Sequence, residues 1–581
     1  MDILGVNTGH DAGIALIRDG VFVELISEER FSRIKGHQGF PISCVAYVRR
    51  KYGVHHFDRV VVISASGRYL TPLMGIPENV VCRARQGEKL FAKSIMYRLG
   101  ILQIWRQLRI QSVHLSQPFV KKKIDALLKQ HFPTERITHM EHHLAHAWSA
   151  LAFDPSLEDG IVVTLDGEGD GLCGSINKIE NGHVRRLAAF PAGTGIGTLY
   201  GKVTEFLGMK RNEHEFKVMG LAPYAKPSHG EIVLAEFRRL LAYDADKMKF
   251  RAAFNMQYAK YYFIAHNYIR YRFDTIAYAI QRFTEELVST VVASLRKRYA
   301  PPAFYFAGGV FMNIKLNQKL SEQETVGCHF TPSSGDESLA IGAAKYGYEM
   351  ETRDQVQPIS TLYLGTEYSD SDVQDVLFNL DPESYIVKFF GKESAPIERK
   401  IASLLAKKEV VARFKGRMEW GARALGNRSI LANPSDASAV RRINEMIKSR
   451  DFWMPFAPTI LDDCADEYLE NWEPSPYMAI GFATKKECRH KLAACIHPYD
   501  FSCRPQILTR ESNPDYYRLI EWFRDDTGIG AILNTSFNLH GYPIVETPAD
   551  ALNVLKNSEL RYLAIGNYLV SKNAKLESKP S

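Results

Sequence analysis

Two histidines spaced four residues apart are the first residues in this sequence that could do chemistry. The stretch EHHLAHAWSA places His142 and His146 at helical positions i and i+4, with no helix-breaking residue between them. Side chains at this spacing lie on one helical face, about one turn apart, where two imidazoles can share one metal ion. The pattern is common, and on this stretch alone buried structural histidines are the more frequent explanation.

Two segments of the chain share one design. Residues 3–17 (ILGVNTGHDAGIALI) and 161–176 (IVVTLDGEGDGLCGSI) each run from an apolar strand through a polar turn into a second strand. The turns carry Asp11 in the first segment and Asp166 and Asp170 in the second, among glycines that let the backbone approach an anion. Unrelated hairpins would also contain Gly-Asp turns. The repetition instead predicts a duplicated α/β half-domain with a cleft between the halves.

Three further stretches offer groups for a nucleotide or a cation. The segment FYFAGGVFMN runs from an apolar strand into Gly308 and Gly309 and then a helical segment bearing Asn313, a turn that leaves backbone N–H groups free for phosphate. Lys217 precedes a glycine-containing turn and could reach a phosphate, although a lone lysine more often forms a surface salt bridge. Asp336 begins a predicted helix, where a carboxylate is usually an N-cap. The stretch GTGIGTLYGKVT does not fit a P-loop, because it lacks the first glycine and the final Ser/Thr.

Most candidate phosphate ligands lie in the second half of the chain. Guanidinium groups bind phosphate oxygens bidentately, and several in one pocket suit a polyphosphate. The glycines and tryptophans between these cations favour a walled pocket over ordinary surface charge. The hydroxyls and amides that end the strand-like stretch ILNTSFN could position a small polar group or a metal-bound phosphate. The candidates are Arg417, Arg423, Lys448, Arg450, Arg504, Asn534 and Ser536.

Composition limits the class of protein. The 581 residues exceed what one core usually holds, and 73 basic against 66 acidic residues are too balanced to imply nucleic-acid binding. No apolar run approaches the about 20 residues of a membrane-spanning helix. The eight cysteines form no CxxC pair, so reduced, mostly buried thiols are expected. The sequence predicts a cytoplasmic multidomain protein, with a domain boundary near 351–360 and a basic helical insertion at 66–130.

Ten motifs together resemble one family. In this order they are typical of the bacterial O-carbamoyltransferases, which include the tobramycin and cephalosporin carbamoyltransferases and the nodulation-factor enzyme. The resemblance covers nearly the whole chain. The motifs are GHDAGIAL (9–16), EERFSRIKG (28–36), EHHLAHAWSA (141–150), LDGEGDG (165–171), EFKVMGLAPYA (215–225), AGGVFMN (307–313), GDESLAIGAA (335–344), GRMEWGARALGNRSIL (416–431), IKSRDFWMPFAP (447–458) and LNTSFNLHGYPIV (533–545).

The resemblance implies an α/β fold in two domains. The first, residues 1–355, would be a duplicated domain of the actin and sugar-kinase type, similar to the tRNA threonylcarbamoyl-transfer proteins. The second, residues 360–572, would be YrdC-like. Carbamoyl phosphate and ATP, the latter with Mg²⁺, would form carbamoyl-adenylate in the second domain. The first domain would then transfer the carbamoyl group to a small-molecule hydroxyl acceptor.

The resemblance also assigns roles to residues. His142, His146, Asp166 and Asp336 match the ligands of a divalent metal, usually Fe(II), and His143 is expected to be structural. His10 and Asp11 match the family's catalytic GHD turn, where His10 would take the proton of the attacking hydroxyl or, alternatively, orient the adenylate by a hydrogen bond. Lys217, Gly308, Gly309 and Asn313 would bind nucleotide in the first domain. One departure is Met454, which stands where many members carry an arginine.

Two enzymatic alternatives and one non-enzymatic alternative remain open. A sugar or metabolite kinase would use the same duplicated fold but needs neither the arginine-rich second domain nor HxxxH. A tRNA threonylcarbamoyl transferase should display a tRNA-binding surface, which the sequence does not suggest. An ATP-dependent regulatory or scaffold protein would agree with the sequence only if the arginine and histidine motifs had lost their function. The sequence does not identify the acceptor, because antibiotics, lipo-oligosaccharides and activated sugars all agree with it. A homodimer is also compatible with the sequence. Neither nucleic acid nor membrane is an expected partner.

Overall fold

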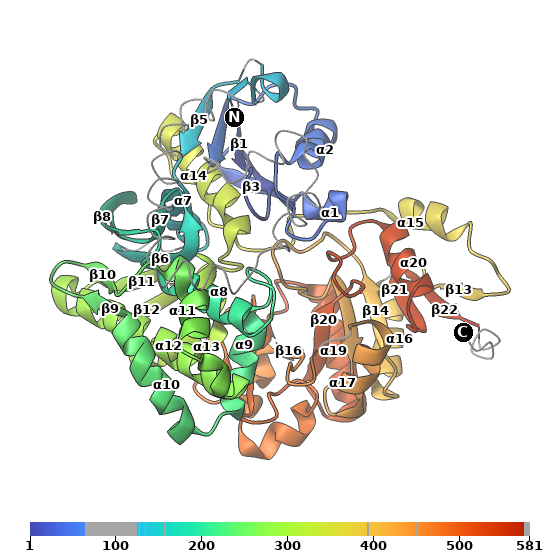
Figure 1. Cartoon of the computed structure of the whole chain (residues 1–581). Helices are drawn as coiled ribbons and strands as arrows, with labels where there is room; N and C mark the ends of the chain where they lie inside the picture. The colour runs from blue at the N-terminus through green and yellow to red at the C-terminus, as the bar shows by residue number, and fades with distance from the viewer. Residues whose placement is uncertain are drawn as a thin grey trace. The chain divides into compact units, whose positions relative to one another are not determined.

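Two mixed α/β units make up the chain (Figure 1). The computed structural model describes residues 1–63, 125–126, 128–133, 135–155, 159–391, 394–448 and 451–573. Unit 1 comprises Met1–Glu28 and Gly36–Ile359, and unit 2 comprises Glu29–Lys35 and Ser360–Ser581. The helical insertion predicted at 66–130 lies almost wholly outside the described residues.

Unit 1 contains two five-stranded sheets of identical topology. Each sheet begins with three strands that are consecutive in the chain and antiparallel to one another. Two strands from later in the chain then pair in parallel beside the first of these three. The strand orders are β3-β2-β1-β4-β5 and β8-β7-β6-β11-β12. The mixed α/β fold is therefore confirmed, and the repeated strand order agrees with the predicted duplication of a half-domain. The strands are β1 (Asp2–Asn7), β2 (Gly13–Arg18), β3 (Val21–Ser27), β4 (Arg59–Ile63), β5 (Ile137–Met140), β6 (Gly160–Gly169), β7 (Leu172–Glu180), β8 (His183–Pro191), β11 (Ala303–Ala307) and β12 (Gly327–Phe330).

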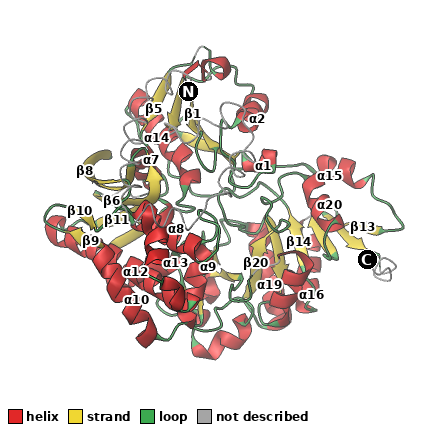
Figure 2. Cartoon of the chain, in the orientation of Figure 1, coloured by secondary structure: helices red, strands yellow, loops and turns green. Residues whose placement is uncertain are grey.

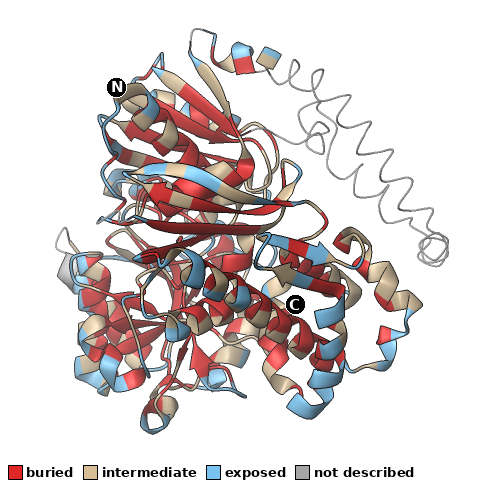
Figure 3. Cartoon of the chain, turned by 90° about the vertical axis from the view of Figure 1, so that its left-hand side faces the viewer, coloured by how far each residue is buried: buried red, intermediate tan, exposed pale blue. Residues whose placement is uncertain are grey.

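The central strands are buried on both faces because their sequences are almost continuously apolar. All residues of β1 except the first are buried, as are all of β11. Figure 3 shows buried residues, in red, along many of the inner strands and helices. The first hairpin of each half turns at an aspartate in the left-handed region, Asp11 with a φ of 52° and Asp170 with a φ of 49°. Aspartate tolerates this conformation better than most residues with a side chain. The two Gly/Asp turns are thus structural equivalents in the duplicated halves.

Two helices of unit 1 are exchanged between its halves. Helix α7 (His142–Ala150) follows β5 of the first sheet but packs on β6 and β11 of the second. Helix α14 (Leu339–Thr352) follows the second sheet but packs on β1 and β4 of the first, and the two helices contact each other. The other helices of at least seven residues in the described part of unit 1 are α2 (Ile42–Tyr52), α8 (Ile196–Phe206), α9 (Glu215–Leu221), α10 (Pro227–Leu240), α11 (Ala259–Ala265), α12 (Phe273–Tyr299) and α13 (Ile314–Gln323).

Unit 2 is built on one eight-stranded mixed sheet, with helices beside its strands (Figure 2). The strand order is β13-β22-β21-β14-β15-β20-β16-β19. These strands are β13 (Tyr385–Phe389), β14 (Val411–Phe414), β15 (Arg428–Ala432), β16 (Ala457–Leu461), β19 (Gln506–Leu508), β20 (Ala531–Ser536), β21 (Tyr562–Ile565) and β22 (Tyr568–Lys572). The helices are α1 (Glu29–Ser32), α15 (Asp370–Leu377), α16 (Ser394–Ala406), α17 (Ser438–Ile443), α18 (Ala465–Tyr468), α19 (Pro514–Thr527) and α20 (Pro548–Lys556).

The division differs from the sequence boundaries in one respect. Residues 29–35 were expected in the first domain, but their contacts group them with unit 2. The main break falls at Ile359, next to the polar stretch that suggested a boundary. None of the described helices combines the length and apolar character needed to cross a bilayer. The seven described cysteines are all free, and all but Cys328 are buried, as expected for reduced thiols.

Candidate functional site

The helix α7 places both histidines of the HxxxH pair inside unit 1. Its N-cap is Glu141, whose carboxylate accepts hydrogen bonds from the backbone N–H groups of His143 and Leu144. The backbone N–H of His142 donates to Asp170 Oδ2 at 2.9 Å, which fixes the helix start to the second Gly/Asp turn. His146 is fully buried and His142 is 7 % exposed. The helical face predicted from the spacing is therefore an internal one.

Two carboxylates complete a four-residue cluster with these histidines. Asp166 lies on β6 and Asp336 stands just before α14. His142 Nε2 lies 3.2 Å from Asp166 Oδ2 and 3.5 Å from Asp336 Oδ1. His146 Nε2 lies 3.1 Å from His142 Nε2 and 3.7 Å from Asp336 Oδ1. One donor atom from each of the four residues lies within 4.8 Å of all the others.

These separations fit a divalent cation. Ligand bonds of about 2.1 Å in a tetrahedral site put neighbouring donor atoms about 3.4 Å apart. The observed separations between donors bracket that value. Two imidazoles with two carboxylates suit a borderline divalent ion, and this donor set does not by itself select one metal.

Atoms from neighbouring segments pack closely against the side chains of the cluster. A Cβ atom at Gly169 would lie 2.2 Å from the His142 ring, so a glycine is required there. Ser338 Oγ lies 3.4 Å from His146 Nδ1 and donates to Gly335 O, which places an oxygen against the ring edge opposite the cluster. The backbone N–H of Gly309 donates to Asp166 Oδ1 at 3.3 Å. Such outer contacts orient metal ligands.

The electrostatics of the cluster also favour a cation. Burial alone would lower the pKa of His142, but Asp336 and Asp166 raise it to about 9. Burial alone would raise the pKa of Asp166, but His142 and His146 bring it below its ordinary value. The site therefore has a negative potential strong enough to retain a proton on a buried imidazole. A divalent cation is the species that such a site exchanges for the proton.

His143 lies on the same helix but outside the cluster. Its ring is fully buried, and Nδ1 lies 3.0 Å from Thr164 Oγ1 on β6. Burial and the neighbouring imidazoles lower the pKa of His143 well below its ordinary value, so the ring is neutral. These contacts agree with the structural role expected for it.

The first Gly/Asp turn carries an imidazole–carboxylate pair. His10 Nδ1 lies 2.6 Å from Asp11 Oδ2. Burial alone would lower the pKa of His10, but Asp11 and, more weakly, Asp336 and Glu337 raise it to about 10. His10 is therefore a cation at neutral pH. Of the two roles considered for it, the charge favours hydrogen-bond donation over acceptance of a proton.

Two residues of this region were not singled out by their sequence pattern. Asn7 Nδ2 donates to the backbone carbonyls of His10, Asp11 and Asp336, so one buried amide joins the first turn to the start of α14. Glu337 is half-buried; desolvation and, more weakly, the charge of Asp11 raise its pKa to about 8, and Ser333 Oγ donates to it. Only the tertiary fold brings residues so distant in the chain together, so no local signal could have found them.

The third predicted turn lies beside the same cluster. Gly308 has a φ of 96° and would clash with Leu165 if it bore a Cβ, and a Cβ at Gly309 would lie 2.8 Å from Asp166 Oδ1. Asn313 caps α13, and its amide pairs reciprocally with that of Gln281 on α12. Its side chain is thus already engaged within the protein. Lys217 lies half-buried on α9 and does not belong to the four-residue cluster.

In unit 2 the structure brings Lys448 and Ser536 together. Lys448 is only 3 % exposed, and its ammonium group donates to Ser536 O and Ser536 Oγ. It also donates to Asn538 Oδ1 at 2.6 Å. Arg417 donates to Gly365 O, and Arg423 and Arg504 are half-buried. Arg450 lies outside the described residues.

Buried polar atoms near these residues lack a hydrogen-bond partner within the described part of the chain. They are Glu419 Oε2, Asn534 Oδ1, Arg428 Nε and Arg428 Nη2. Glu419 Oε1 accepts from the N–H groups of Leu425 and Arg428, and Asn534 Nδ2 donates to Ala424 O. Because buried polar groups are costly when unpaired, this region has the capacity to bind a polar ligand or ordered water. Glu419 and Arg428 therefore join the candidates from the sequence.

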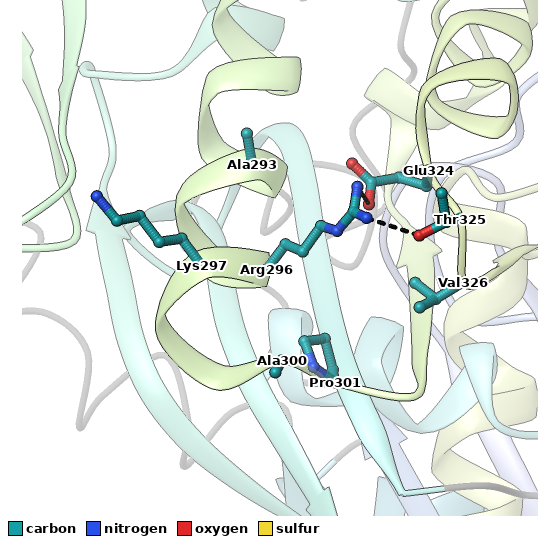
Figure 4. A pocket seen from close by; sticks show the side chains of 8 residues that line it. All are labelled: Ala293, Arg296, Lys297, Ala300, Pro301, Glu324, Thr325 and Val326. Carbon is teal, nitrogen blue, oxygen red and sulfur yellow. Dashed lines mark hydrogen bonds and ion pairs between the residues drawn. The ribbon is translucent and has the colours of Figure 1, made fainter.

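A surface hollow of about 450 Å³ lies elsewhere in unit 1, at the C-terminal end of α12 (Figure 4). Arg296 on its wall donates to Glu324 Oε2 and Thr325 Oγ1, so its main charged group is paired within the protein. None of the predicted site residues lines it. We assign it no ligand.

The chain matches a described family along most of its length. Residues 2–345 match the family described as "Carbamoyltransferase N-terminus", and residues 402–572 match "Carbamoyltransferase C-terminus". An uncharacterized protein of Methanocaldococcus jannaschii is 30% identical over 98% of this chain and 99% of its own. The nodulation protein NolNO of Sinorhizobium fredii is 29% identical over 97% of this chain and 79% of its own. The 3'-hydroxymethylcephem-O-carbamoyltransferase of Streptomyces clavuligerus is 26% identical over 73% and 79%.

Solved structures resemble the chain only partially. Full-length HypF in its phosphate- and nucleotide-bound form covers 61% of this chain and 56% of its own at 12% identity, with a TM-score of 0.31. A score of this size is too low to transfer a fold or a site.

The metal assignment predicts opposite outcomes for two neighbouring histidines. We expect His146→Ala to lose its metal ion, with an affinity decrease of at least about 100-fold, because the change removes a nitrogen donor. His143→Ala is the matched control, since it truncates an equally buried ring that faces Thr164. Metal content per chain is measured by mass spectrometry after dialysis. Stoichiometric metal in the His146 variant would show that the cluster is not the binding site.

A second prediction tests the packing around His142. Gly169→Ala should displace the His142 ring and reduce metal content about as strongly as loss of a ligand, because the added Cβ has no room. Gly167→Ala lies two residues earlier on the same strand, and its Cβ would meet only Arg211 Nη2 at 3.9 Å. That control should bind metal normally. Equal metal content in the two variants would contradict the proposed placement of His142.

Proposed function

Because the chain belongs to the carbamoyltransferase family, we propose that it is an ATP-dependent O-carbamoyltransferase that uses carbamoyl phosphate and a small-molecule hydroxyl acceptor. The observation that carries the proposal is the combination of both family regions in one chain with a four-residue metal cluster in the first region. A kinase would need neither the second region nor the cluster.

The proposed reaction balances in three steps. Water releases phosphate from carbamoyl phosphate and leaves carbamate. A carbamate oxygen then attacks the α-phosphorus of ATP, so that carbamoyl-adenylate forms and pyrophosphate leaves. Finally the acceptor hydroxyl attacks the carbamoyl carbon, the bond to the adenylate oxygen breaks, and AMP and the O-carbamoyl product are released.

We assign the first two steps to unit 2. Arg417, Arg423, Arg450 and Arg504 supply guanidinium groups, which bind phosphate oxygens in bidentate fashion. The buried Lys448 carries a positive charge to the end of β20, where Ser536 and Asn538 surround its ammonium group. The unpartnered polar atoms of Glu419, Arg428 and Asn534 support a polar ligand at this place.

We assign carbamoyl transfer to unit 1. His142, His146, Asp166 and Asp336 would hold the metal, Fe(II) or a similar ion, which when bound supplies positive charge to polarise the carbamoyl group. Gly308 and Gly309 form a turn without side chains beside Asp166, which lets the adenylate phosphate approach the backbone closely. Their own N–H groups donate to Ser334 O and Asp166 Oδ1. Asn313 and Lys217 remain candidates for nucleotide contacts, although the Asn313 amide is already paired with Gln281.

His10 and Asp11 act as a charged pair in this proposal. The cationic imidazole of His10 donates a hydrogen bond to the adenylate phosphate and so stabilises the departing AMP. Asp11 is the adjacent carboxylate that can accept the proton of the attacking hydroxyl, since carboxylates are common general bases. The raised pKa of His10 supports this division over a basic His10.

The finer fold assignments are also proposals. The identical topology of the two sheets in unit 1, with its exchanged helices, supports a duplicated domain of the actin and sugar-kinase type. For unit 2, a YrdC-like domain remains our proposal from motif resemblance. The acceptor is an alcohol on a natural product, a lipo-oligosaccharide or an activated sugar; the relatives named for nodulation and for a cephem support this range.

The decisive experiment uses purified protein, ATP, carbamoyl phosphate and labelled pyrophosphate. Exchange of label into ATP that requires carbamoyl phosphate supports the adenylate. Transfer of phosphate from ATP to an added sugar would instead support the kinase alternative, and threonylcarbamoylation of adenosine in added tRNA would support the tRNA threonylcarbamoyl transferase.

Lys448 should be needed for this exchange. We expect Lys448→Met to lower the exchange rate about 10- to 150-fold, because it removes charge-assisted hydrogen bonds of about 1.5–3 kcal/mol. The control is Lys485→Met, which removes another unit-2 lysine that binds a backbone carbonyl, that of Asp466. Metal content should be normal in both variants. An unchanged exchange rate in Lys448→Met would remove this residue from the site.

His10 should matter only after the adenylate has formed. We expect His10→Gln to retain pyrophosphate exchange and metal while transfer falls about 100-fold or more, because the imidazolium charge is lost. Since the pKa of His10 is raised to about 10, the donating form persists below that pH. The rate of transfer in single turnovers should therefore stay level as far as about pH 9 and decline above about pH 10. A rate that climbs tenfold per pH unit between 6 and 8 would restore His10 as the base.

A further inference from the structure

A seven-residue segment of the N-terminal chain forms part of unit 2. Residues 29–35 contain the short helix α1 and group with the C-terminal residues. Arg30 is only 5 % exposed, and its guanidinium donates to Gly421 O at 2.8 Å. Its other contact is Glu29 Oε1 at 3.0 Å. A buried arginine is thus fixed on a backbone carbonyl nearly four hundred residues later in the chain.

Arg33 makes a second and wider attachment. Its Nη1 donates to Ile544 O at 2.7 Å, and its Nη2 donates to Pro543 O at 2.9 Å. Its Nε lies 3.6 Å from Asp550 Oδ1 at the start of α20. The planar guanidinium therefore spans two consecutive carbonyls and a carboxylate, a geometry that one ammonium group does not reproduce.

The carbonyls that these arginines bind belong to two loops, of which one carries Arg417 and Arg423 and the other directly follows Ser536. Gly421 lies between Arg417 and Arg423. Ile544 ends the loop that follows Ser536, and this loop is closed by a hydrogen bond from Val545 N to Phe537 O. On the other limb of the same loop, Asn538 donates to Tyr542 O and accepts from Lys448.

The two loops are also joined to each other. Met418, Ala424 and Ile544 form a separate apolar cluster of buried side chains. Ile544 thus packs against the first loop with its side chain while its carbonyl accepts from Arg33. A displacement of the Pro543–Ile544 backbone would therefore move the loop bearing Arg417 and Arg423.

We propose that Arg30 and Arg33 are positioning residues for the phosphate-binding site of unit 2. They hold the loops 416–428 and 537–545 in register, so residues from the N-terminal chain complete a site whose other candidates all come from the C-terminal half. The inference rests on the proposed function, because it takes carbamoyl phosphate and ATP as the ligands of that site.

The ends of the segment are themselves fixed in unit 1. Glu28 N donates to Ala12 O, and Ala12 N donates to His37 O. The chain therefore leaves and re-enters unit 1 at the turn that carries His10 and Asp11.

The test uses full-length protein with Arg33→Ala, Arg33→Lys and the control Arg49→Ala. Arg49 is similarly exposed and also donates to a backbone carbonyl, His131 O, and a carboxylate, but lies in unit 1. In pyrophosphate exchange, the KM for carbamoyl phosphate should rise about 10-fold or more in Arg33→Ala, with a smaller change in kcat. Arg33→Lys should recover only part of this loss. Arg49→Ala should keep KM within about twofold of wild type, although it also loses hydrogen bonds to a backbone carbonyl and a carboxylate.

A KM within about twofold of wild type in Arg33→Ala overturns the proposal, provided that wild-type protein catalyses the exchange. If wild-type protein shows no pyrophosphate exchange, the proposed function fails. Hydrogen–deuterium exchange of the backbone amides then tests the positioning role by itself. Faster hydrogen–deuterium exchange in peptides covering 416–428 and 537–545 of Arg33→Ala, but not of Arg49→Ala, supports the positioning role. Unchanged exchange in both peptides overturns it.

Discussion

The close contact between α7 and α14 is the constraint on which the metal cluster depends. A Cβ at Gly342 on α14 would lie 1.9 Å from Ala145 O on α7, so the two backbones touch with no side chain between them. On its other side α14 approaches β1 equally closely, because a Cβ at Gly5 would lie 2.0 Å from Ala340 O. Each helix packs on the sheet of the other half, and this exchange brings His142 and His146 from one half against Asp336 from the other.

The two units handle buried polarity in different ways. In unit 1 the buried polar groups of the cluster face one another: the carboxylates raise the pKa of His142, the imidazoles lower that of Asp166, and a cation can take the place of the proton. In unit 2 buried groups such as Arg428 Nη2 and Asn534 Oδ1 have no partner among the described residues. Unpaired buried polar atoms are costly unless something binds them. The first pattern suits a small ion held by side chains, and the second suits a larger polar ligand that contacts loops and side chains together.

The sequence predicted features that are local or repeated, and it missed those that depend on tertiary contacts. The paired Gly/Asp turns revealed the duplication because each half repeats the same short pattern. The HxxxH spacing placed two donors on one helical face, and motif resemblance supplied Asp166 and Asp336. By contrast, the missed features depend on contacts between distant segments. These contacts are the close approach of Gly169 to the His142 ring, the pairing of Asn313 with Gln281, and the hydrogen bond from Asn7 to Asp336 O. The grouping of residues 29–35 with unit 2 was missed for the same reason, since Arg33 meets its partners more than 500 residues away.

The charge distribution in unit 1 bears on how an anionic intermediate can be accepted there. The carboxylates of Asp11, Asp166, Asp170, Asp336 and Glu337 converge on the region of the two Gly/Asp turns and the start of α14. Without compensation they would repel an adenylate phosphate, because like charges in a partly buried site are weakly screened. The imidazolium of His10, held 2.6 Å from Asp11, offsets one of these charges at neutral pH. Retention of a proton on Glu337, whose pKa is raised to about 8, removes another. A divalent cation among His142, His146, Asp166 and Asp336 is what would bring the balance to a state that tolerates a phosphate at Gly309. In the proposed reaction, holding the metal and accepting the adenylate would therefore be one electrostatic requirement.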